Sequence, residues 1–470
     1  MPELLNWLDD SEIRMLHNEA LNIIEEVGIK LDNSTLLNKL KSFDTTIDMS
    51  NKQMKIPRDI VTHFLSKVPD NVTLYAIDSK YDLELGKQTY FRPISGTIGI
   101  IENRMDVRKP TVQDMCTISK LVQGLESMHF NATSVIPFDV PENMRAVASA
   151  RACFENCSKH VLVDALNKRD LEIILEMAFA ISGGENEFME RPFMQVHFPA
   201  ISPLIWDENA CDSVLVATEY QIPMRVGSSP MSGANSPIKL AGTLLLMHAE
   251  AIAAVAVTQM LREGCPVYYG AAPTLFDMRF GTMSWGAAEH AKMASCSAAL
   301  AHSCNLFVTS TGFATDGKTP DQQVAIEKSM NLLLAALSGI DVLAGAGLFE
   351  GELCYDPVQL IIDNEIARYV ENVLKGVQID REQMCSDLIK EVGIGGQYLD
   401  TEQTLQFFRT EHQESTLLDR RSRGVWNGIE EKDIYDKAAK MMDDIIAEQS
   451  DHQLSDKVRG QIDDIYRKNQ

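Results

Sequence analysis

The stretch of sequence that decides the fold lies between residues 226 and 290. It begins VGSSPMSGANSPIKLAGTLLLMHAEAIAAVAV (226–257) and continues, after a short loop, as PVYYGAAPTLFDMRFGTMSWGAAEH (266–290). We interpret it as a strand that ends in a Gly/Ser/Pro loop, a long small-residue helix, a second short strand, and a loop that carries Asp277 and Arg279. It is therefore predicted to be a βαβ unit. In parallel α/β proteins the functional groups lie beyond the carboxyl ends of such strands.

The same alternation of strands and helices extends along most of the chain. The expected strands are 94–101, 128–135, 160–165, 192–198, 222–228, 266–271, 304–311 and 340–346. The helical patterns between them are 112–125, 142–157, 168–183, 207–220, 238–262, 285–302 and 320–338. Eight strands that alternate with helices predict an α/β fold of the TIM-barrel type, (β/α)8. A doubly wound sheet is a weaker alternative because no Gly-x-Gly-x-x-Gly motif opens the first βα turn.

The segments on either side of this alternation have a different character. An amphipathic helix is expected over 11–27, and it is followed by shorter helical pieces and short strands. Residues 1–93 are therefore predicted to form an N-terminal α+β cap, and the barrel is predicted to span 94–356. The last part, 357–470, is helical and increasingly charged, and we expect it to be a C-terminal extension packed on the barrel.

The charge balance of the chain is strongly acidic. The 470 residues include 43 Lys and Arg against 67 Asp and Glu, which gives a net charge of −24. A surface with this charge repels nucleic acids and anionic membranes, so we expect neither as a partner. The hydrophobic share of 45% is that of an ordinary globular protein.

The cysteines and the apolar segments predict a cytoplasmic protein. Nine cysteines, an odd number placed mostly within apolar segments, indicate reduced thiols. The N-terminal residues MPELLNWLDDSE lack the basic and apolar regions of a signal peptide. The most apolar run, 239–261, contains Lys239, His248 and Glu250, so we interpret it as a helix packed on the sheet rather than a membrane span.

Two kinds of catalytic centre lack their usual motifs. Cys153 and Cys157 are four residues apart, and Cys296, His302 and Cys304 lie close to the seventh strand, but neither group has CxxC or HExxH spacing. We therefore predict no bound metal, and a zinc site assembled from distant Cys and His residues is the open alternative. No GxSxG motif indicates a nucleophilic serine.

Aromatic residues gather where the expected strands end. Those at or after strands six to eight are Tyr268, Tyr269, Phe276, Phe313, Phe349 and Tyr355, and those at the end of strand four are His197, Phe198 and Trp206. Aromatic faces attract cations, and quaternary ammonium groups above all. The set predicts an aromatic pocket for a cation, although each residue taken alone also fits a role in packing.

Charged residues near these strand ends could bind the other charged group of a ligand whose cation lies in the aromatic pocket. Asp277 and Arg279 lie two residues apart in a loop, so their side chains can point the same way. Further candidates for binding a carboxylate are Arg92, Arg225 and Lys318. A structural clamp within the loop is the alternative interpretation of Asp277 and Arg279.

Longer stretches carry a resemblance to a known family. They are EALNIIEEVGI (19–29), PMSGANSPIKLAGTLLLMHAEAIA (230–253), PVYYGAAPTLFDMRFGTMSWGAAE (266–289), DGKTPDQQVAIEKSMNLLLAALSG (316–339), GAGLFEGELCYDPVQLIIDNEIA (345–367) and TLQFFRTEHQESTLLDRRS (404–422). With them the chain resembles the trimethylamine methyltransferase superfamily over nearly its full length. It is most similar to the branch that lacks pyrrolysine.

The resemblance implies an enzyme that moves a methyl group from a methylated amine to the cobalt(I) of cobalamin. This corrinoid cofactor is carried by a separate, cognate corrinoid protein. Members with pyrrolysine use trimethylamine, whereas members without it resemble demethylases of quaternary amines. This sequence contains no pyrrolysine, so we expect glycine betaine as the substrate, with proline betaine, carnitine and γ-butyrobetaine as alternatives. A homo-oligomer is also expected.

The chemistry of a quaternary amine agrees with the absence of metal and nucleophile motifs. Its nitrogen has no lone pair and departs as a neutral tertiary amine, so the enzyme needs no general acid or base and no metal of its own. The residues expected in the substrate site are Tyr269, Phe313, Phe349 and Tyr355 around the trimethylammonium group, Glu350 for charge, Arg279 or Arg92 for the carboxylate, Asp277 beside Arg279, and His197 as a polar wall. Two rival functions remain: a zinc-dependent methyltransferase for methanol or thiols, and a betaine-binding protein without enzymatic activity.

Overall fold

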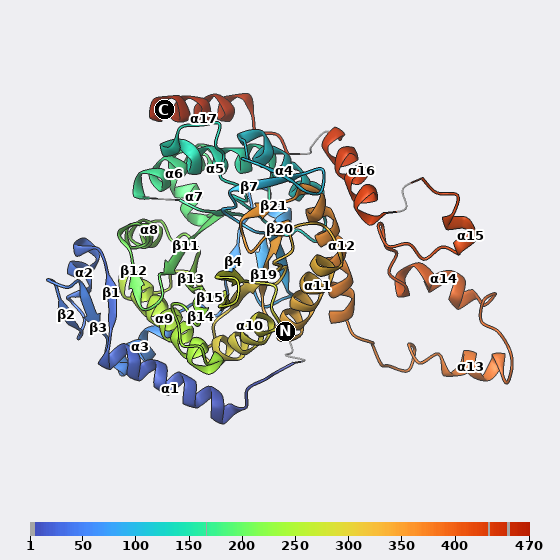
Figure 1. Cartoon of the computed structure of the whole chain (residues 1–470), viewed down its shortest axis with the longest axis horizontal. Helices are drawn as coiled ribbons and strands as arrows, with labels where there is room; N and C mark the ends of the chain where they lie inside the picture. Colours follow the sequence, from blue (N-terminus) through green and yellow to red (C-terminus); the bar gives the residue numbers. More distant parts are fainter. Residues whose placement is uncertain (1–4, 166, 431–432, 449–451) are drawn as a thin grey trace.

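Eight parallel strands form a nearly closed barrel at the centre of the molecule (Figure 1). The structure is a computed structural model that describes residues 5–165, 167–430, 433–448 and 452–470. The strands follow the order β6 (Tyr90–Pro93), β19 (Val342–Ala346), β18 (Val308–Thr311), β15 (Val267–Ala271), β13 (Met224–Ser228), β11 (Met194–Ala200), β10 (Val161–Val163) and β9 (Asn131–Ala132). The predicted (β/α)8 barrel is confirmed.

Eight helices surround the barrel and connect its strands. They are α4 (Val112–Gly124), α5 (Arg145–Asn156), α6 (Lys168–Ser182), α8 (Glu208–Glu219), α9 (Leu240–Leu261), α10 (Ala288–His302), α11 (Gln322–Leu337) and α12 (Pro357–Leu374). Several of them begin at a side chain that accepts a backbone N–H, such as Thr111, Asn167 and Asp207. The sequence analysis placed α12 in the C-terminal extension, but it follows β19 and packs beside α11 as the last barrel helix.

The first barrel strand differs from the prediction. The expected strand 94–101 ends in β7 (Gly99–Glu102), which pairs outside the barrel with β8 (Asp106–Arg108) and β21 (Cys354–Tyr355). The barrel begins instead with β6, whose four residues were assigned to the N-terminal cap. Short strands on either side of a turn look alike in sequence, and only pairing with β19 identifies β6 as the barrel strand.

A hairpin closes the amino-terminal end of the barrel. It is formed by β4 (Thr73–Leu74) and β5 (Leu83–Glu84). Its apolar residues share one buried cluster with inward-facing strand residues near the starts of the strands: Val72, Leu74, Leu83, Leu85, Tyr90, Phe130, Leu162, Tyr268 and Val342. Among the described residues, apolar side chains therefore fill the amino-terminal end of the barrel interior, and the carboxyl end is left for a ligand.

The rest of the N-terminal region packs on the outside of the barrel. Helix α1 (Asp10–Glu26) starts with a capping box of Asp9 and Glu12, and together with α3 (Arg58–Leu65) it lies against α9. A small sheet is built from β1 (Ile29–Leu31), β2 (Thr46–Asp48), β3 (Gln53–Lys55) and β12 (Ile205–Trp206), with α2 (Ser34–Leu40) beside it.

Helix α9 is the central element of the stretch that predicted the fold. Among the described residues it is the one helix long and apolar enough to cross a membrane, but 72% of its most apolar window is buried within the protein. It packs on β13 and β15 from one side and carries α1 and α3 on the other. Its all-round apolar character is explained by this position between two layers.

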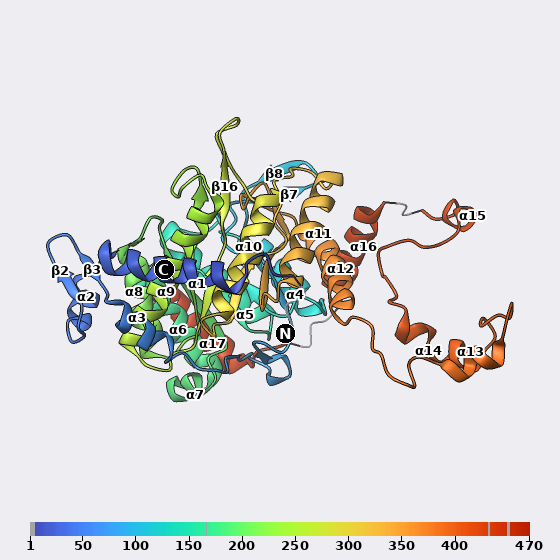
Figure 2. The same cartoon turned by 90° about the horizontal axis from the view of Figure 1, so that it is seen from below.

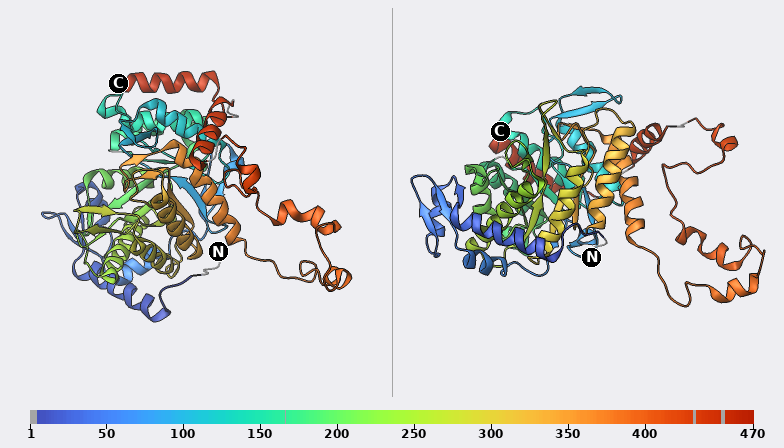
Figure 3. Two further views of the ribbon diagram at one scale, coloured as in Figure 1. Left: turned by 45° about the vertical axis from the view of Figure 1, so that its right-hand side comes forward. Right: turned by 60° about the horizontal axis from the view of Figure 1, so that its bottom comes forward.

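The C-terminal region divides into a packed part and a projecting part. Helix α16 (Ile434–Ala447) lies on α12 and α4, and α17 (Asp456–Asn469) lies on α6. Between α12 and α16, residues 376–430 contain α13 (Ser386–Val392), α14 (Glu402–Glu411) and α15 (Arg423–Trp426), and these three helices lie away from the barrel (Figures 2 and 3). Within this segment, Thr416 donates to Glu365 on α12 at 2.9 Å, and Leu417 is buried beside α16. The expectation that the whole extension packs on the barrel is therefore wrong for these three helices, and we call residues 376–430 the arm.

Candidate functional site

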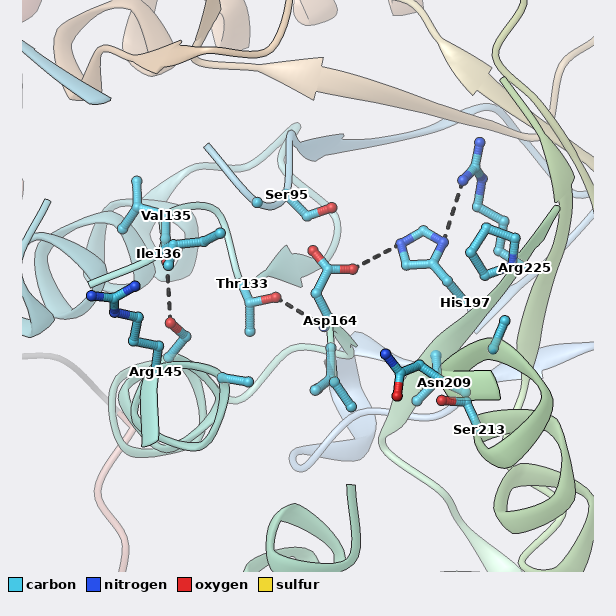
Figure 4. Close-up of a pocket in the computed structure, with 18 of the residues that line it drawn as sticks. Ser95, Thr133, Val135, Ile136, Arg145, Asp164, His197, Asn209, Ser213 and Arg225 are labelled. Carbon is cyan, nitrogen blue, oxygen red and sulfur yellow. Dashed lines mark hydrogen bonds and ion pairs between the residues drawn. The ribbon is translucent and has the colours of Figure 1, made fainter. Parts of the chain in front are cut away.

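An opening that reaches the barrel interior lies at the carboxyl ends of β10, β11 and β13 (Figure 4). It is a cavity of about 510 Å³ whose walls include Ser95, Thr133, Asp164, His197 and Arg225. A smaller recess of about 50 Å³ shares some of these residues and lies toward the strands on the other side of the barrel. The residues that line the recess include Arg92, Ser95, His197, Arg225, Trp285, Thr311 and Glu352.

Strand alternation turns the polar side chains into the barrel. In β6, Tyr90 and Arg92 face inward while Phe91 packs in the outer core. The parallel register pairs His197 of β11 with Arg225 of β13, so both side chains lie on the inner face at the same level. Asp164 follows β10 directly and reaches the same level.

Asp164, His197 and Arg225 form a chain of contacts in the cavity wall (Figure 4). Asp164 Oδ1 lies 3.1 Å from His197 Nε2, and His197 Nδ1 lies 3.3 Å from Arg225 Nη1. A guanidinium can only donate, so Nδ1 must accept and Nε2–H donates to the carboxylate. Burial lowers the pKa of His197 against the raising effect of Asp164, which agrees with a neutral imidazole.

Arg92 is a buried arginine with unused hydrogen-bonding capacity. Its side chain is 4% exposed, and its Nη1 donates to the carbonyl oxygen of Pro93 at 2.9 Å. Its Nε has no hydrogen-bond partner among the described residues. Burial, with the nearby positive charge of Arg225, lowers the pKa of Arg92 to about 10, so it is still charged at neutral pH.

Two carboxyl groups, those of Asp164 and Glu352, lie near the positive charges of Arg92 and Arg225, and they differ in how readily they ionise. Burial would raise the pKa of Asp164, but the hydrogen bond and charge of His197 and the charge of Arg92 bring it below its ordinary value. Burial raises the pKa of Glu352 to about 7, although Arg225 and Arg92 oppose this rise. At neutral pH the recess therefore holds two cations and one carboxyl group that is half ionised, and the ionised Asp164 lies in the wall of the adjoining cavity.

The aromatic wall of the recess is Trp285. It is 2% exposed, and its indole Nε1 has no partner among the described residues. Asp316 fixes its position by accepting the backbone N–H of Trp285 at 2.7 Å and that of Gly286 at 3.1 Å. Glu352 lies in the loop between β20 (Leu348–Phe349) and β21, where its backbone is left-handed, with a φ of +79°. A strained conformation of this kind is held by its surroundings and is frequent at binding sites.

The structure brings two of the nine predicted site residues to this recess, His197 and Arg92. Tyr269 points the other way, toward the helix layer, where its hydroxyl lies 3.2 Å from His248 Nδ1 on α9. Its neighbour Tyr268 faces the barrel interior. Successive residues of a strand face opposite sides of the sheet, so one of the two tyrosines must point inward. The sequence analysis chose Tyr269, whereas the inward-facing residue is Tyr268.

The other predicted aromatic residues are buried outside the recess. Phe313 packs against Phe91, with ring centroids 6.0 Å apart, and Phe349 belongs to a small apolar cluster with Ile101. Tyr355 is also fully buried. The loops that carry these residues turn back over the barrel, so their side chains fill space between loops and helices. Glu350 is half-buried beside them and does not line the recess.

Asp277 and Arg279 lie on a hairpin away from the recess. The hairpin consists of β16 (Thr274–Asp277) and β17 (Thr282–Ser284), and Arg279 is 80% exposed at its turn. Arg279 Nη2 lies 2.5 Å from Asp277 Oδ2, and the backbone N–H of Arg279 also donates to Asp277 Oδ1 at 2.9 Å. The structural clamp that was the alternative interpretation describes this pair.

Sequence reasoning missed three residues that line the recess or the adjoining cavity, and it named Arg225 only as a further candidate. The missed residues are Asp164, Trp285 and Glu352. One signal was available for Asp164 and Arg225. A lone charged residue inside or directly after an apolar strand, as in HVLVDA (160–165) and IPMRVGS (222–228), indicates an inward-facing position in a barrel. Trp285 and Glu352 come from loops and carry no such signal.

Comparison with known proteins identifies relatives over the whole chain. The model of the family described as trimethylamine methyltransferase (MTTB) matches residues 2–470. The trimethylamine methyltransferase MttB of Desulfitobacterium hafniense (strain DSM 10664 / DCB-2) is 30% identical over 463 residues, which cover 98% of this chain and 93% of that protein. The glycine betaine methyltransferase of Desulfitobacterium hafniense (strain Y51) is 30% identical over 424 residues, covering 90% and 88%.

A solved structure with the same fold is that of the Methanosarcina barkeri monomethylamine methyltransferase (MtmB). It superposes with a TM-score of 0.53 at 14% identity, covering 94% of this chain and 89% of that one. This likeness supports the barrel architecture alone.

Proposed function

The chain belongs to the trimethylamine methyltransferase (MTTB) family and is a methyltransferase, and from this premise we propose that it demethylates a quaternary amine that carries a carboxylate. The substrate proposed is glycine betaine. The methyl acceptor proposed is the corrinoid of a partner protein. One of the relatives is named a glycine betaine methyltransferase, which supports this choice.

The observation that carries the proposal is the pair of arginines, Arg92 and Arg225, in the recess. Arg92 Nε is buried without a partner among the described residues, and a buried donor is costly unless something accepts its hydrogen bond. A substrate carboxylate can accept from both guanidinium groups. Trimethylamine has no carboxylate and would leave these donors unused.

Two further residues that line the recess suit the ammonium end of a betaine. The face of Trp285 attracts a quaternary ammonium group, and the Glu352 carboxylate offers the matching negative charge. Ionisation of Glu352 is opposed by burial, and a bound cation beside it favours the ionised form. The recess thus offers both positive and negative groups, as a zwitterion requires.

The proposed reaction requires no general acid or base from the protein. A quaternary nitrogen cannot be protonated, and it leaves as a neutral tertiary amine when the methyl group is transferred. The corrinoid supplies cobalt(I), a strong nucleophile, when the partner protein is bound. The arginines and Trp285 hold the substrate in one orientation and, with the neutral His197 wall, keep water from the reacting methyl group.

The shape of the site fits access by a cofactor on another protein. The recess shares Ser95, His197 and Arg225 with the cavity of about 510 Å³, and both lie at the open, carboxyl end of the barrel. The amino-terminal end is closed by the β4–β5 hairpin. A corrinoid therefore has one side from which to approach.

The test is a methyl-transfer assay with cob(I)alamin and five amines: glycine betaine, proline betaine, carnitine, γ-butyrobetaine and trimethylamine. Methylcobalamin is followed by its absorbance. The proposal expects transfer from a betaine and none from trimethylamine. Transfer from trimethylamine alone would refute it. Binding of a betaine without any transfer, with the cognate corrinoid protein present, would favour the rival binding protein instead.

A further inference from the structure

Three side chains that commonly bind metals converge on the outer side of the barrel wall. His17 lies on α1, His248 on α9, and Cys304 just after α10. One potential ligand atom from each lies within 4.8 Å of the other two. These residues are 231 to 287 positions apart from His17 in the chain, so the fold alone brings them together.

The spacing of the three atoms is that of ligands around one small ion. His17 Nδ1 lies 3.0 Å from His248 Nε2, and Cys304 Sγ lies 3.6 Å from His17 Nδ1. Tetrahedral zinc with bonds of about 2.0–2.1 Å to nitrogen and about 2.3 Å to sulfur places two nitrogens about 3.3 Å apart, and nitrogen and sulfur about 3.5 Å apart. We propose that His17, His248 and Cys304 bind a zinc ion or a similar thiophilic divalent cation.

The surroundings of His248 support this assignment. Its Nδ1 lies 3.2 Å from the Tyr269 hydroxyl, which leaves Nε2 aimed at the cluster. A metal-bound histidine usually donates its second ring N–H to an oxygen, and this contact both selects the tautomer and orients the ring. His248 is fully buried, whereas His17 and Cys304 are half-buried and leave a route to solvent.

Hydrogen bonds alone account less well for the cluster. His17 Nδ1 is close to both His248 Nε2 and Cys304 Sγ, yet one ring nitrogen offers a single proton or a single lone pair. A cation at the common point binds all three atoms at once, with the Cys304 thiol losing its proton to solvent. Water is the natural fourth ligand on the exposed side.

The site is separate from the proposed methyl-transfer site and has a structural role. Its ligands join α1 to α9 and to the loop after α10, so a bound ion fixes the N-terminal helix to the barrel wall. Tyr269 lies behind it on the outer face of β15, while Tyr268 faces the barrel interior. The ion is therefore not in contact with the recess. A zinc site of this kind, assembled from distant Cys and His residues, is the alternative that the sequence left open beside the prediction of no bound metal.

The experiment uses the full-length protein stripped with a chelator and then titrated with Zn²⁺ and with Co²⁺. We expect one equivalent of zinc by elemental analysis, a rise in Tm on zinc addition, and for Co²⁺ the absorption bands of a tetrahedral ion bound to a thiolate. Cys304→Ser should abolish the thiolate band, and His17→Ala should weaken Co²⁺ binding by roughly tenfold or more.

Cys116→Ser is the matched control, because Cys116 is a half-buried cysteine on α4, away from the cluster. It should leave the Co²⁺ spectrum unchanged. Circular dichroism checks that each variant is folded, and His17→Ala provides a second test if Cys304→Ser does not fold. Failure of the wild-type protein to bind about one equivalent would overturn the proposal. So would Co²⁺ spectra that neither variant alters. None of these readouts depends on methyl transfer.

Discussion

Burying an arginine costs free energy unless an anion pairs with it. Arg92 and Arg225 are both buried and line the same recess. Arg225→Lys keeps the charge but loses the planar fork that grips a carboxylate. Since a hydrogen bond to a charged group contributes about 1.5–3 kcal/mol, we expect KM for glycine betaine to rise roughly ten- to hundredfold. Steady-state assays with free cob(I)alamin measure it.

Arg279→Ala is the control for this substitution. Arg279 is exposed and paired with Asp277, so its removal should leave KM for glycine betaine unchanged when free cob(I)alamin is the acceptor. Equal increases in KM for the two variants would contradict the assignment of the carboxylate to the recess.

Glu352 should make the reaction depend on pH near neutrality. Its pKa is raised by burial to about 7, and its ionised form is the one that complements a quaternary ammonium group. We expect kcat/KM, which reports the free enzyme, to rise with pH and level off above about 7. Glu352→Gln should lower the plateau and remove the rise. A wild-type profile that is flat between pH 6 and 8 would contradict this role.

The same carboxyl group has the opposite effect on stability. A folded-state pKa above the ordinary value of 4.5 means that Glu352 contributes stability below that value and loses it as the pH rises through about 7. Glu352→Gln should therefore have a higher Tm than the wild type above pH 7, with the difference shrinking in acid. Thermal unfolding across this pH range checks the sign.

Lys328 and Asp363 form an ion pair with no exposed surface, and Nζ lies 2.6 Å from Oδ2. Asp363 also accepts the backbone N–H of Gly347, which joins the loop after β19 to α12. Lys328→Met strands the buried carboxylate, and we expect a loss of roughly 3–5 kcal/mol in the free energy of unfolding. Denaturant unfolding measures it. Lys168→Met, which removes the exposed pair with Glu172, should change it by less than about 0.5 kcal/mol.

Residues of the site were harder to predict than the strands that carry them. Arg92 and His197 were found because charge and position agreed, but Tyr269 was chosen over Tyr268. Both tyrosines lie within β15, and which of them faces inward depends on the register of β15 with β13, which is not apparent from the sequence. Glu352 and Trp285 depend on loop conformations, including a left-handed backbone at a non-glycine residue.

At the scale of elements, the β16–β17 hairpin stands out from the carboxyl side of the barrel (Figure 2). Its turn exposes Met278 at 73% and Phe280 at 74%, and the Asp277–Arg279 pair stiffens it. On the basis of the proposed function, we expect this turn to contact the corrinoid protein, which must cover the open end of the barrel.

Met278→Asp with Phe280→Asp tests this contact. Transfer to the cognate corrinoid protein should need a higher partner concentration, because two apolar contacts become charged, while transfer to free cob(I)alamin should stay the same. Arg423→Ala, on the arm, serves as a surface control. An equal loss with both acceptors would mean that the hairpin acts on the site itself.

The elements themselves were largely predictable. The alternation of apolar strands and amphipathic helices identified seven barrel strands in approximately the right places, because a buried parallel strand must be apolar on both faces. Strand β6 was missed because YFRP is only four residues long and its partner β19 lies some 250 positions away, which local patterns do not reveal.

At the scale of the whole molecule, the arm exposes apolar side chains that nothing within a single chain covers among the described residues. Residues 376–430 expose large apolar side chains, among them Val377 at 84%, Ile379 at 73% and Leu399 at 79%. Such a surface is unfavourable in water unless another surface covers it. We propose that a second copy of this chain does so, in line with the homo-oligomer expected from the sequence.

Replacing Ile379, Leu399 and Leu405 with Ser should weaken that assembly. Light scattering after size-exclusion chromatography should show an oligomer for the wild type and a shift toward monomer for the variant at the same concentration. Replacement of exposed Val27 is a control. Val27 directly follows α1, and α1 lies on the opposite side of the molecule from α13 and α14 in Figure 1. A monomeric wild-type protein would contradict the proposal.

The β4–β5 hairpin that fills the floor of the barrel has a kinetic consequence. On the basis of the proposed function, the amine and the corrinoid must both reach the recess from the carboxyl end of the barrel, so the order in which they bind matters. The amine has to enter first, and the demethylated product waits until the partner departs. A large excess of the partner protein would then inhibit turnover, because a bound partner would block entry of the amine into the empty barrel. If the proposed function is correct, the apolar cluster beneath the β4–β5 hairpin determines the order in which amine and partner protein bind, although it lies far from the recess.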